Sequence, residues 1–168
     1  MSFRSCHIGS TTSAGSRPGH DRGQREWLKR MRVLVTGSAG FIGHALSRAL
    51  LERGDIVTGI DNMNDYYQTS LKDARTSDLH AAGGNRFTFM RQDFSDMPAL
   101  QAALDGVDID RIVHLGAQAG VRYSIENPHA YVQSNLSGHV NMLELARHRA
   151  VDHMVYASSS SVYGGNAK

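Results

Sequence analysis

Short apolar runs alternate along the chain with longer stretches in which apolar residues recur at helical spacing. Five of the runs, rich in β-branched and aromatic residues, predict buried strands at residues 33–35, 56–60, 87–90, 111–115 and 153–157. The runs are three to five residues long. They do not show the regular alternation of apolar and polar residues that is typical of a surface strand, so we expect a sheet covered on both faces.

Two of the intervening stretches predict amphipathic helices. After the first strand, one helical face collects apolar residues, and Gly54 follows it as a stop; its members are Phe41, Ile42, Ala45, Leu46, Ala49 and Leu50. Before the last strand, apolar residues again recur at helical spacing, at Val132, Leu136, Val140, Leu143 and Ala146. We expect both faces to pack against the sheet.

Strands that alternate with helices predict βαβ units, which require a parallel sheet and right-handed crossovers. The fold class expected is α/β, a Rossmann-like, doubly wound parallel sheet of about five strands in the order 3-2-1-4-5. The chain has 168 residues, 40% of them hydrophobic, which suffices for one core of ordinary size. The sequence therefore predicts one domain over residues 31–168.

The first 30 residues differ in composition from the rest. They carry six basic and two acidic side chains, a net charge of +4, whereas residues 31–168 carry 12 basic and 14 acidic ones, a net charge of −2. The body therefore offers no general attraction for nucleic acid. Residues 1–30 are rich in Ser, Gly and Arg without apolar periodicity, which predicts disorder. They either resemble a transit peptide or are a spurious upstream extension, since Met31 directly precedes the first strand.

Composition also excludes several classes of protein. The single cysteine, Cys6, excludes a disulfide scaffold and a cysteine-based zinc site. No apolar run is long enough to predict a membrane span, and we expect a cytoplasmic protein. The histidines lack the spacings typical of metal ligands, and His114 is interpreted as an ordinary strand histidine, so no metal site is predicted.

A glycine-rich loop joins the first strand to the first helix. Gly37, Gly40 and Gly43 are spaced three apart, a variant of the dinucleotide-binding fingerprint. We expect Gly37 to permit the tight turn, Gly40 to let a pyrophosphate approach the backbone, and Gly43 to let the helix lie close to the sheet. Free N–H groups at the helix start would then bind the diphosphate. No Gly-Lys-Ser/Thr sequence follows the glycines, which excludes the phosphate-binding loop of nucleoside triphosphatases.

Asp61 ends the second strand 18 residues after Gly43, close to the spacing expected for an acid that binds the adenosine ribose. A carboxylate there would repel a 2′-phosphate, which favours NAD over NADP. The alternative is that Asp61 and Asn62 are simply turn-forming residues at a strand end.

With these residues in place, the chain resembles the extended short-chain dehydrogenase/reductase group, in its NAD-dependent epimerase/dehydratase family, and most closely the UDP-glucuronate 4-epimerases. The segments that carry the resemblance are VTGSAGFIG at 35–43, GIDN at 59–62, NDYY at 64–67, HLGAQAGVRYS at 114–124, ENP at 126–128 and YASSSSVYG at 156–164. The glycine loop is common to the group, whereas NDYY and AGVRYS are typical of the glucuronate branch. The resemblance covers roughly the N-terminal half of such enzymes.

The resemblance implies a reaction and a set of site residues. The reaction is epimerisation at C4 of a UDP-linked uronic acid, through a 4-keto intermediate and transient hydride transfer to NAD. The implied cofactor-binding residues are Gly37, Gly40, Phe41, Ile42, Gly43, Asp61, Asn62, Asp93, Phe94, Leu115, Gly116, Ala117 and Asn135. Ser159 matches the catalytic Ser/Thr, and the implied substrate-binding residues are Arg122, Tyr123, Ser159 and Ser160. Relatives often form homodimers through the helix that holds Val132 to Ala146.

Several of these residues have simpler interpretations. Asp93 is equally a turn residue at a strand end, Asn135 a helix surface residue between the packing positions Val132 and Leu136, and Arg122 a solvated charge. The serine run 158–161 could be a plain polar loop. Its place at the carboxyl end of a central parallel strand favours ligand binding instead.

Two departures from the family pattern matter. Gly116 stands where relatives usually carry alanine. The second departure concerns the Tyr-x-x-x-Lys pair that supplies the family's base, because no tyrosine in this chain is followed by lysine four positions later. The helix that carries this pair and the C-terminal substrate domain are missing. We therefore expect a truncated protein that is inactive alone.

Two alternatives to a truncated epimerase remain. One is a sugar-nucleotide dehydratase or decarboxylase of the same group, although the positions where those enzymes carry carboxylates are Ser160 and Ser161. The other is an NAD-binding module that performs no chemistry, such as a redox sensor or a partner subunit.

Overall fold

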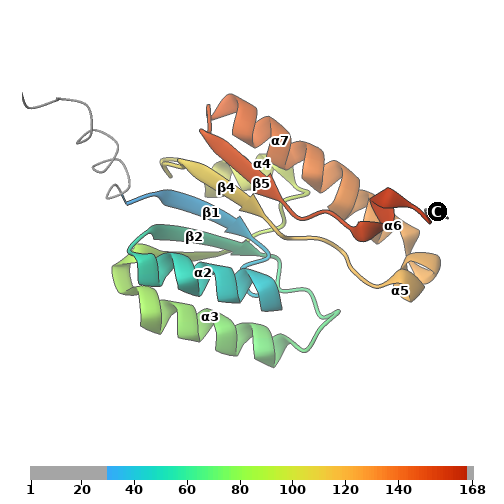
Figure 1. The fold of residues 1–168 in the computed structure, drawn as a ribbon, viewed down its shortest axis with the longest axis horizontal. Helices are drawn as coiled ribbons and strands as arrows, with labels where there is room; N and C mark the ends of the chain where they lie inside the picture. The colour runs from blue at the N-terminus through green and yellow to red at the C-terminus, as the bar shows by residue number, and fades with distance from the viewer. Residues whose placement is uncertain (1–29, 166–168) are drawn as a thin grey trace, which may run out of the picture.

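Five parallel strands form one sheet in the order β3–β2–β1–β4–β5, as the sequence predicts (Figure 1). The strands are β1 (Arg32–Thr36), β2 (Ile56–Asp61), β3 (Phe87–Arg91), β4 (Arg111–His114) and β5 (His153–Tyr156). Each one overlaps a run identified in the sequence. The computed structural model describes residues 30–165, so the predicted disorder of residues 1–30 lies, apart from Arg30, outside the described residues.

Helices cover both faces of the sheet, which makes the fold doubly wound (Figure 1). Helices α2 (Phe41–Arg53) and α3 (Thr69–Gly83) lie on one face, and α4 (Met97–Ala103) and α7 (Gly138–His148) lie on the other. Side chains alternate along β1, so that Val33 and Val35 join the core under α2 and α3 while Leu34 joins the core under α4 and α7. The central strand therefore links the two cores.

The remaining elements are short. Near the carboxyl ends of the strands lie α5 (Val121–Glu126), α6 (Pro128–Tyr131) and a π-helical segment η2 (Val132–Ser137), which leads into α7. Two 3₁₀ turns, η1 (Gly84–Arg86) and η3 (Ser160–Tyr163), follow α3 and β5. The sequence patterns did not identify α3, α4 or α5 individually.

The first helix packs through a face that only partly coincides with the predicted one, since Leu50 is buried and Leu46 packs against the core as predicted. The residues that α2 buries are Gly43, Ser47, Leu50 and Leu51, whereas Phe41 and Ile42 are exposed. Gly43 belongs to this face because a Cβ atom there would meet the Gly37 carbonyl of the preceding loop. Gly54 does end the helix as predicted, with φ = 102°, a conformation that glycine adopts without strain.

The predicted apolar face of residues 132–146 is wrong except at Ala146, which packs against the core. The residues that α7 buries are Gly138, Met142 and Leu145, whereas Val132, Leu136 and Val140 are exposed. The π-helical segment η2 interrupts the helix, and an i→i+5 turn shifts the angular position of side chains on either side of it. A constant helical period therefore could not identify which apolar residues face the sheet.

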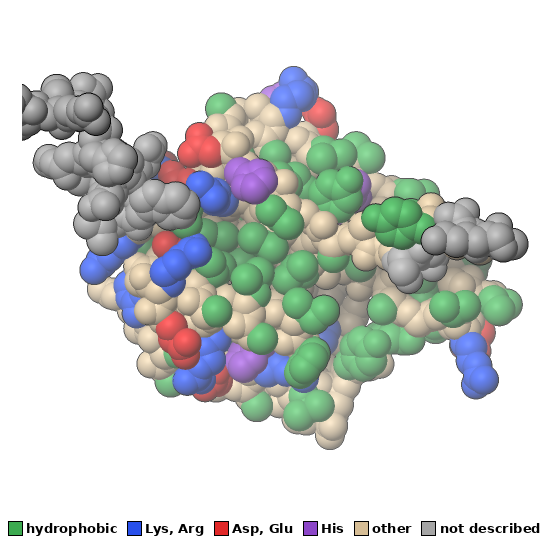
Figure 2. Space-filling view, viewed as in Figure 1, with side chains coloured by type: hydrophobic (Ala, Val, Ile, Leu, Met, Phe, Trp, Pro, Cys, Tyr) green, Lys and Arg blue, Asp and Glu red, His purple; other side chains and the backbone are tan. Residues whose placement is uncertain are grey.

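The β5 side of the sheet is more exposed than the β2 side. Five of the six residues of β2 are buried, whereas β5 has no buried residue. Figure 2 shows hydrophobic side chains gathered across the middle of the visible face, where β4 and β5 lie in Figure 1. Within residues 30–165 no helix combines the length and the apolar character needed to cross a lipid bilayer.

Candidate functional site

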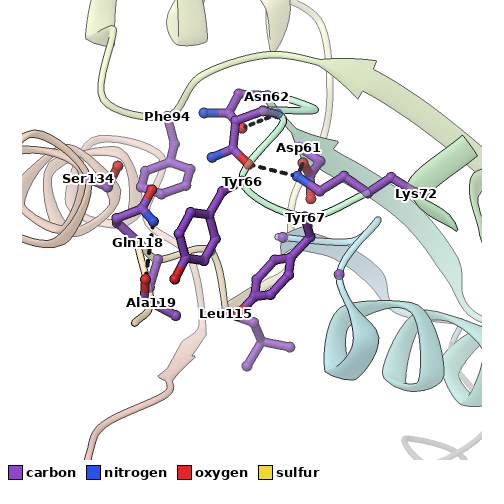
Figure 3. A pocket seen from close by; sticks show the side chains of 15 residues that line it. Asp61, Asn62, Tyr66, Tyr67, Lys72, Phe94, Leu115, Gln118, Ala119 and Ser134 are labelled. Carbon is purple, nitrogen blue, oxygen red and sulfur yellow. Dashed lines mark hydrogen bonds and ion pairs between the residues drawn. The ribbon is translucent and has the colours of Figure 1, made fainter. Parts of the chain in front are cut away.

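A cavity of about 130 Å³ opens at the carboxyl ends of β1, β2 and β4. The glycine loop, the segment after β2 and the loop after β4 form its walls (Figure 3). Eight of the predicted site residues line it: Gly37, Gly40, Asp61, Asn62, Phe94, Leu115, Gly116 and Ala117. The structure thus brings together residues that lie up to 80 positions apart in the sequence.

The glycine loop has the geometry that its spacing predicts. Gly37 has φ = +70°, and its N–H donates to the Ile60 carbonyl over 2.7 Å, which ties the turn to β2. A Cβ atom on Gly43 would lie 2.0 Å from the Gly37 carbonyl oxygen, so only glycine permits this approach of helix to loop. Phe41 and Ile42 contribute the first helical N–H groups, although their side chains point to solvent.

The start of α2 is open to an anion. No side chain caps its N-terminus, and its first turn contains no acidic residue. The first N–H groups of a helix have no intrahelical acceptor, and the helix dipole places partial positive charge there. Since Gly37 and Gly40 line the cavity beside this turn, the arrangement suits a phosphate group.

Asp61 is buried at the end of β2, on the wall of the cavity. Its Oδ1 accepts a hydrogen bond of 2.9 Å from the Met63 N–H and faces the Lys72 ammonium at 3.3 Å. Lys72 reaches the carboxylate from α3 (Figure 3), and its Nζ also donates to Asn64 Oδ1 over 3.0 Å. Sequence reasoning missed Lys72. The available signal was its position as the one lysine between residues 30 and 165.

Asn62 and Asp93 connect the ends of β2 and β3. The Asn62 Nδ2 donates to Asp93 Oδ2 over 3.0 Å, while Asp93 Oδ1 accepts from the backbone and hydroxyl of Ser95. Partial burial raises the pKa of the Asp93 carboxyl, but the donors from Ser95 and Asn62 outweigh this and hold the pKa below its usual value. Asn62 lines the cavity, whereas Asp93 lies behind it as a turn residue that orients Asn62.

Thr36 organises the loop after β4 and was not identified from the sequence. Its hydroxyl oxygen accepts hydrogen bonds from the N–H groups of Leu115 (3.2 Å) and Gly116 (3.0 Å), and it lies 2.7 Å from His114 Nδ1. Because both lone pairs are used, the hydroxyl donates its proton to Nδ1. Burial lowers the pKa of His114 to about 4, with a further contribution from His139, so the ring is neutral and can accept that bond.

Asn135 holds the next part of the same loop. Its Oδ1 accepts from the Gln118 N–H over 2.8 Å, and its Nδ2 donates to the Gln118 carbonyl over 2.9 Å. The Asn135 side chain therefore satisfies both the backbone N–H and the backbone carbonyl of Gln118. Asn135 therefore holds this loop from η2 and is not a free residue on the helix surface.

Gly116 has a packing role that explains its departure from alanine. A Cβ atom at this position would lie 2.5 Å from Cε1 of Phe94, and one on Gly138 would lie equally close to Cε2 of the same ring. Two glycines therefore make room for Phe94, whose ring also meets His114 edge to face at 5.1 Å. Phe94 in turn closes the floor of the cavity.

A second, larger cavity of about 580 Å³ lies on the other side of the same loop. It includes Ser158 and Ser159 after β5, together with His114, Asn135 and His139. Leu115–Ala119 line both cavities, so an elongated ligand could lie across this loop with one end in each. The side chain of Ser160 lies outside the described residues.

Tyrosines surround the outer end of the first cavity. The ring centroids of Tyr66 and Tyr67 lie 4.8 Å apart (Figure 3), and those of Tyr66 and Tyr123 lie 5.1 Å apart. Tyr131 donates from its hydroxyl to the carbonyls of Ala119 and Gly120, which fixes the end of the loop. The structure therefore brings Tyr123 to the edge of the site.

Arg122 is not brought to either cavity. Its side chain is exposed on α5, so the structure agrees with a solvated charge in this conformation. Within residues 30–165 there is no group of three or more His, Cys, Asp or Glu side chains able to hold a metal ion.

Comparisons with known proteins agree with this geometry. A family model described as GDP-mannose 4,6 dehydratase matches residues 34–168. The chain is 46% identical over 138 residues to a probable UDP-glucuronate 4-epimerase of Rhizobium meliloti, a match that covers 82% of this chain and 40% of that protein. It is 45% identical over 155 residues to UDP-glucuronate 4-epimerase 2 of Arabidopsis thaliana, with 84% and 35% covered.

A solved structure also matches. UDP-glucose-4-epimerase from Stenotrophomonas maltophila, with bound NAD and formylated UDP-arabinopyranose, superposes with a TM-score of 0.71 at 29% identity. The match covers 83% of this chain and 40% of that one. The chain thus spans about two fifths of the length of the relatives that it matches.

Proposed function

The chain belongs to the GDP-mannose 4,6 dehydratase family, and on that basis we propose that residues 31–168 form the NAD-binding part of a nucleotide-sugar 4-epimerase. The observation that carries the proposal is the meeting of the glycine loop, the uncapped start of α2 and the buried Asp61 around one cavity. The substrate proposed is UDP-glucuronate, supported by two relatives that are described as UDP-glucuronate 4-epimerases.

The residues present fit NAD. The close approach of Gly43 to Gly37 leaves backbone N–H groups at the start of α2 open to a diphosphate. Asp61 is positioned to accept hydrogen bonds from the adenosine ribose, with Asn62 beside it and Asp93 orienting Asn62. Leu115, Gly116 and Ala117 would lie along the nicotinamide ribose, with Thr36 fixing the backbone of Leu115 and Gly116 and Asn135 fixing that of the following Gln118.

The cofactor, when bound, supplies a reversible hydride acceptor for the sugar carbon. The chain's own contribution is position. Ser159 borders the larger cavity next to the Leu115–Ala119 wall, where its hydroxyl would hydrogen-bond the sugar 4-OH. Tyr123 would contact the nucleotide sugar from the edge of the first cavity, and Ser160 from the turn after Ser159. Arg122, exposed on α5 in this conformation, would reach the nucleotide sugar only after its side chain moves. No tyrosine here is followed by lysine four positions on, so we propose that the chain alone is inactive.

The family description names a dehydratase, and the identities of residues 160 and 161 argue against that reaction. Both are serine, so neither supplies the carboxylate that elimination of water requires for acid–base catalysis. We therefore favour epimerisation, in which the sugar loses no atoms.

Calorimetric titration of the purified chain with NAD tests the cofactor assignment. We expect saturable binding, a loss of at least about tenfold in affinity in Asp61→Ala because ribose hydrogen bonds disappear, and no change in Asp65→Ala on the exposed loop nearby. The same sample should show no turnover of UDP-glucuronate. Equal NAD affinity in the two variants would contradict the site.

Product analysis tests the reaction in the longer protein that carries this segment. We expect UDP-glucuronate to yield UDP-galacturonate, with a large fall in rate in Ser159→Ala and little change in Ser158→Ala. A pentose from UDP-glucuronate would instead support the decarboxylase alternative, and a 4-keto-6-deoxy sugar from UDP-glucose would support the dehydratase alternative.

We also propose a homodimer built on the exposed apolar residues of η2 and α7, which are Val132, Leu136, Val140 and Leu143. All four side chains are exposed, so they are available for contact with a second copy of the chain. Analytical ultracentrifugation of the longer protein should show a dimer that Leu136→Asp converts to monomers. An unchanged mass in that variant would contradict this interface.

A further inference from the structure

Lys72 is buried at a place where a cation is costly. Its side chain is 8% exposed, as is that of its partner Asp61. Removing an ammonium from water is unfavourable unless it gains a counter-charge and hydrogen bonds. A buried ammonium therefore influences which charged groups can bind beside it. Lys72 lies in the wall of the first cavity together with Asp61 (Figure 3), which directs attention to ligands that both could touch.

The contacts of the pair leave one position free on each partner. Among the described residues the bonds to the Asp61 carboxylate, from Lys72 and the Met63 N–H, end on Oδ1, which leaves Oδ2 for a ligand. Within the same part of the chain, the Lys72 ammonium donates to Asp61 and Asn64, and it carries three N–H bonds. One donor and one acceptor therefore remain at the ribose end of the cavity.

We propose that the Asp61–Lys72 pair sets the cofactor preference, with Lys72 acting as a latent ligand for a 2′-phosphate that Asp61 keeps suppressed. The inference rests on the proposed binding of NAD. The Asp61 carboxylate engages the ammonium and repels a phosphate dianion, while its Oδ2 remains available to a ribose hydroxyl. NAD is favoured because it presents the hydroxyl and not the phosphate.

The charges around the pair determine what removal of the carboxylate would do. Lys72 would lose its counter-charge while staying in the cavity wall, held by Asn64. Arg75, one turn further along α3, donates to the Ala39 carbonyl over 3.3 Å, so a second cation of this helix faces the glycine loop. A phosphate placed beside Asp61 would then meet an unpaired ammonium in a partly dry site, where charge-assisted hydrogen bonds are strongest.

The test compares NAD and NADP binding by calorimetry in four forms of the chain: wild type, Asp61→Asn, Lys72→Met and Asp61→Asn with Lys72→Met. We expect wild type to prefer NAD. Asp61→Asn should gain about tenfold to a hundredfold in NADP affinity relative to NAD, the value of a charge-assisted hydrogen bond. The double variant should lose that gain, whereas Asp61→Asn with Lys72→Arg should retain it.

Circular dichroism melting of each variant verifies that it is folded, and raised salt should reduce the NADP gain of Asp61→Asn because the new contact is ionic. A gain that persists in the double variant, or no gain in Asp61→Asn, overturns the role of Lys72 while leaving NAD binding intact. A folded wild-type chain that binds neither dinucleotide overturns the proposed function, and this inference with it.

Discussion

The two ends of the site differ in how completely the chain builds them. Around Asp61, every polar side chain named above has a partner: Lys72 pairs with the carboxylate and Asn62 with Asp93. Around Ser159, the wall is the exposed β5 and the turn after it. The β2 side is covered by α2 and α3, which directly follow β1 and β2 in the sequence. The Asp61 end is therefore preformed, and the Ser159 end is open.

This difference predicts unequal effects of equal truncations. Leu51→Ala removes a side chain that is 1% exposed on the buried face of α2 and should cost about 2–5 kcal/mol of unfolding free energy. Leu136→Ala removes one that is 63% exposed and should cost less than about 0.5 kcal/mol. Urea denaturation of both variants measures the contrast. Similar losses would show that the two sides are equally packed.

Acid should destabilise the chain through His114, at the boundary between the two ends. The pKa of His114 falls from 6.5 to about 4 on folding, so the unfolded state takes up the proton first as the pH drops. Stability is unaffected above the unfolded pKa and is lost as the pH falls from about 6.5 towards 4, by up to about 3 kcal/mol.

Replacing this group should flatten the pH dependence. His114→Gln keeps an acceptor for the Thr36 hydroxyl but cannot titrate, so its unfolding free energy should vary less with pH than that of the wild type. His129→Gln, on the exposed surface of α6, is the matched control and should retain the wild-type curve. Parallel curves for His114→Gln and wild type would rule out His114 as the source.

A smaller effect is expected at Thr36, which links the end of β1 to the Leu115–Ala119 segment that lines both cavities. Thr36→Val preserves shape but leaves the N–H groups of Leu115 and Gly116 without their acceptor, at a cost of about 1–3 kcal/mol. Amide hydrogen exchange should accelerate at those two residues. Thr88→Val, exposed on β3, should change neither stability nor exchange by a comparable amount. Unchanged exchange rates at Leu115 and Gly116 in Thr36→Val would show that Thr36 does not hold this loop.

The parts of the fold that the sequence could predict are those that depend on local pattern. Strand runs, the order of the sheet and the position of Asp61 at a strand end follow from periodicity and spacing, and the structure confirms the sheet order. The resemblance to the epimerase/dehydratase family is confirmed by the family model and by the relatives. The glycine loop was identifiable because its residue types are dictated by backbone geometry.

What could not be predicted depends on packing between distant segments. The buried face of α2 includes Gly43 and Ser47. At Gly43 the close approach to the Gly37 carbonyl leaves no room for a side chain, so a search for apolar residues does not find this position. The face of α7 was obscured by the π-helical segment before it. Lys72 escaped notice because an isolated lysine on a helix is ordinarily solvated, and only the fold brings it to Asp61.

The most direct test of the central claim is a titration of the ¹⁵N-labelled chain with NAD followed by amide NMR spectra. If the carboxyl edge of the sheet holds the cofactor, the amides of Gly40–Gly43 and of Gly116–Gln118 should shift together and saturate at one affinity. The amides of Asp108 and Asp110, at the opposite edge beside Arg32, should not move. Shifts confined to that opposite edge, or none in a folded chain, would contradict the account.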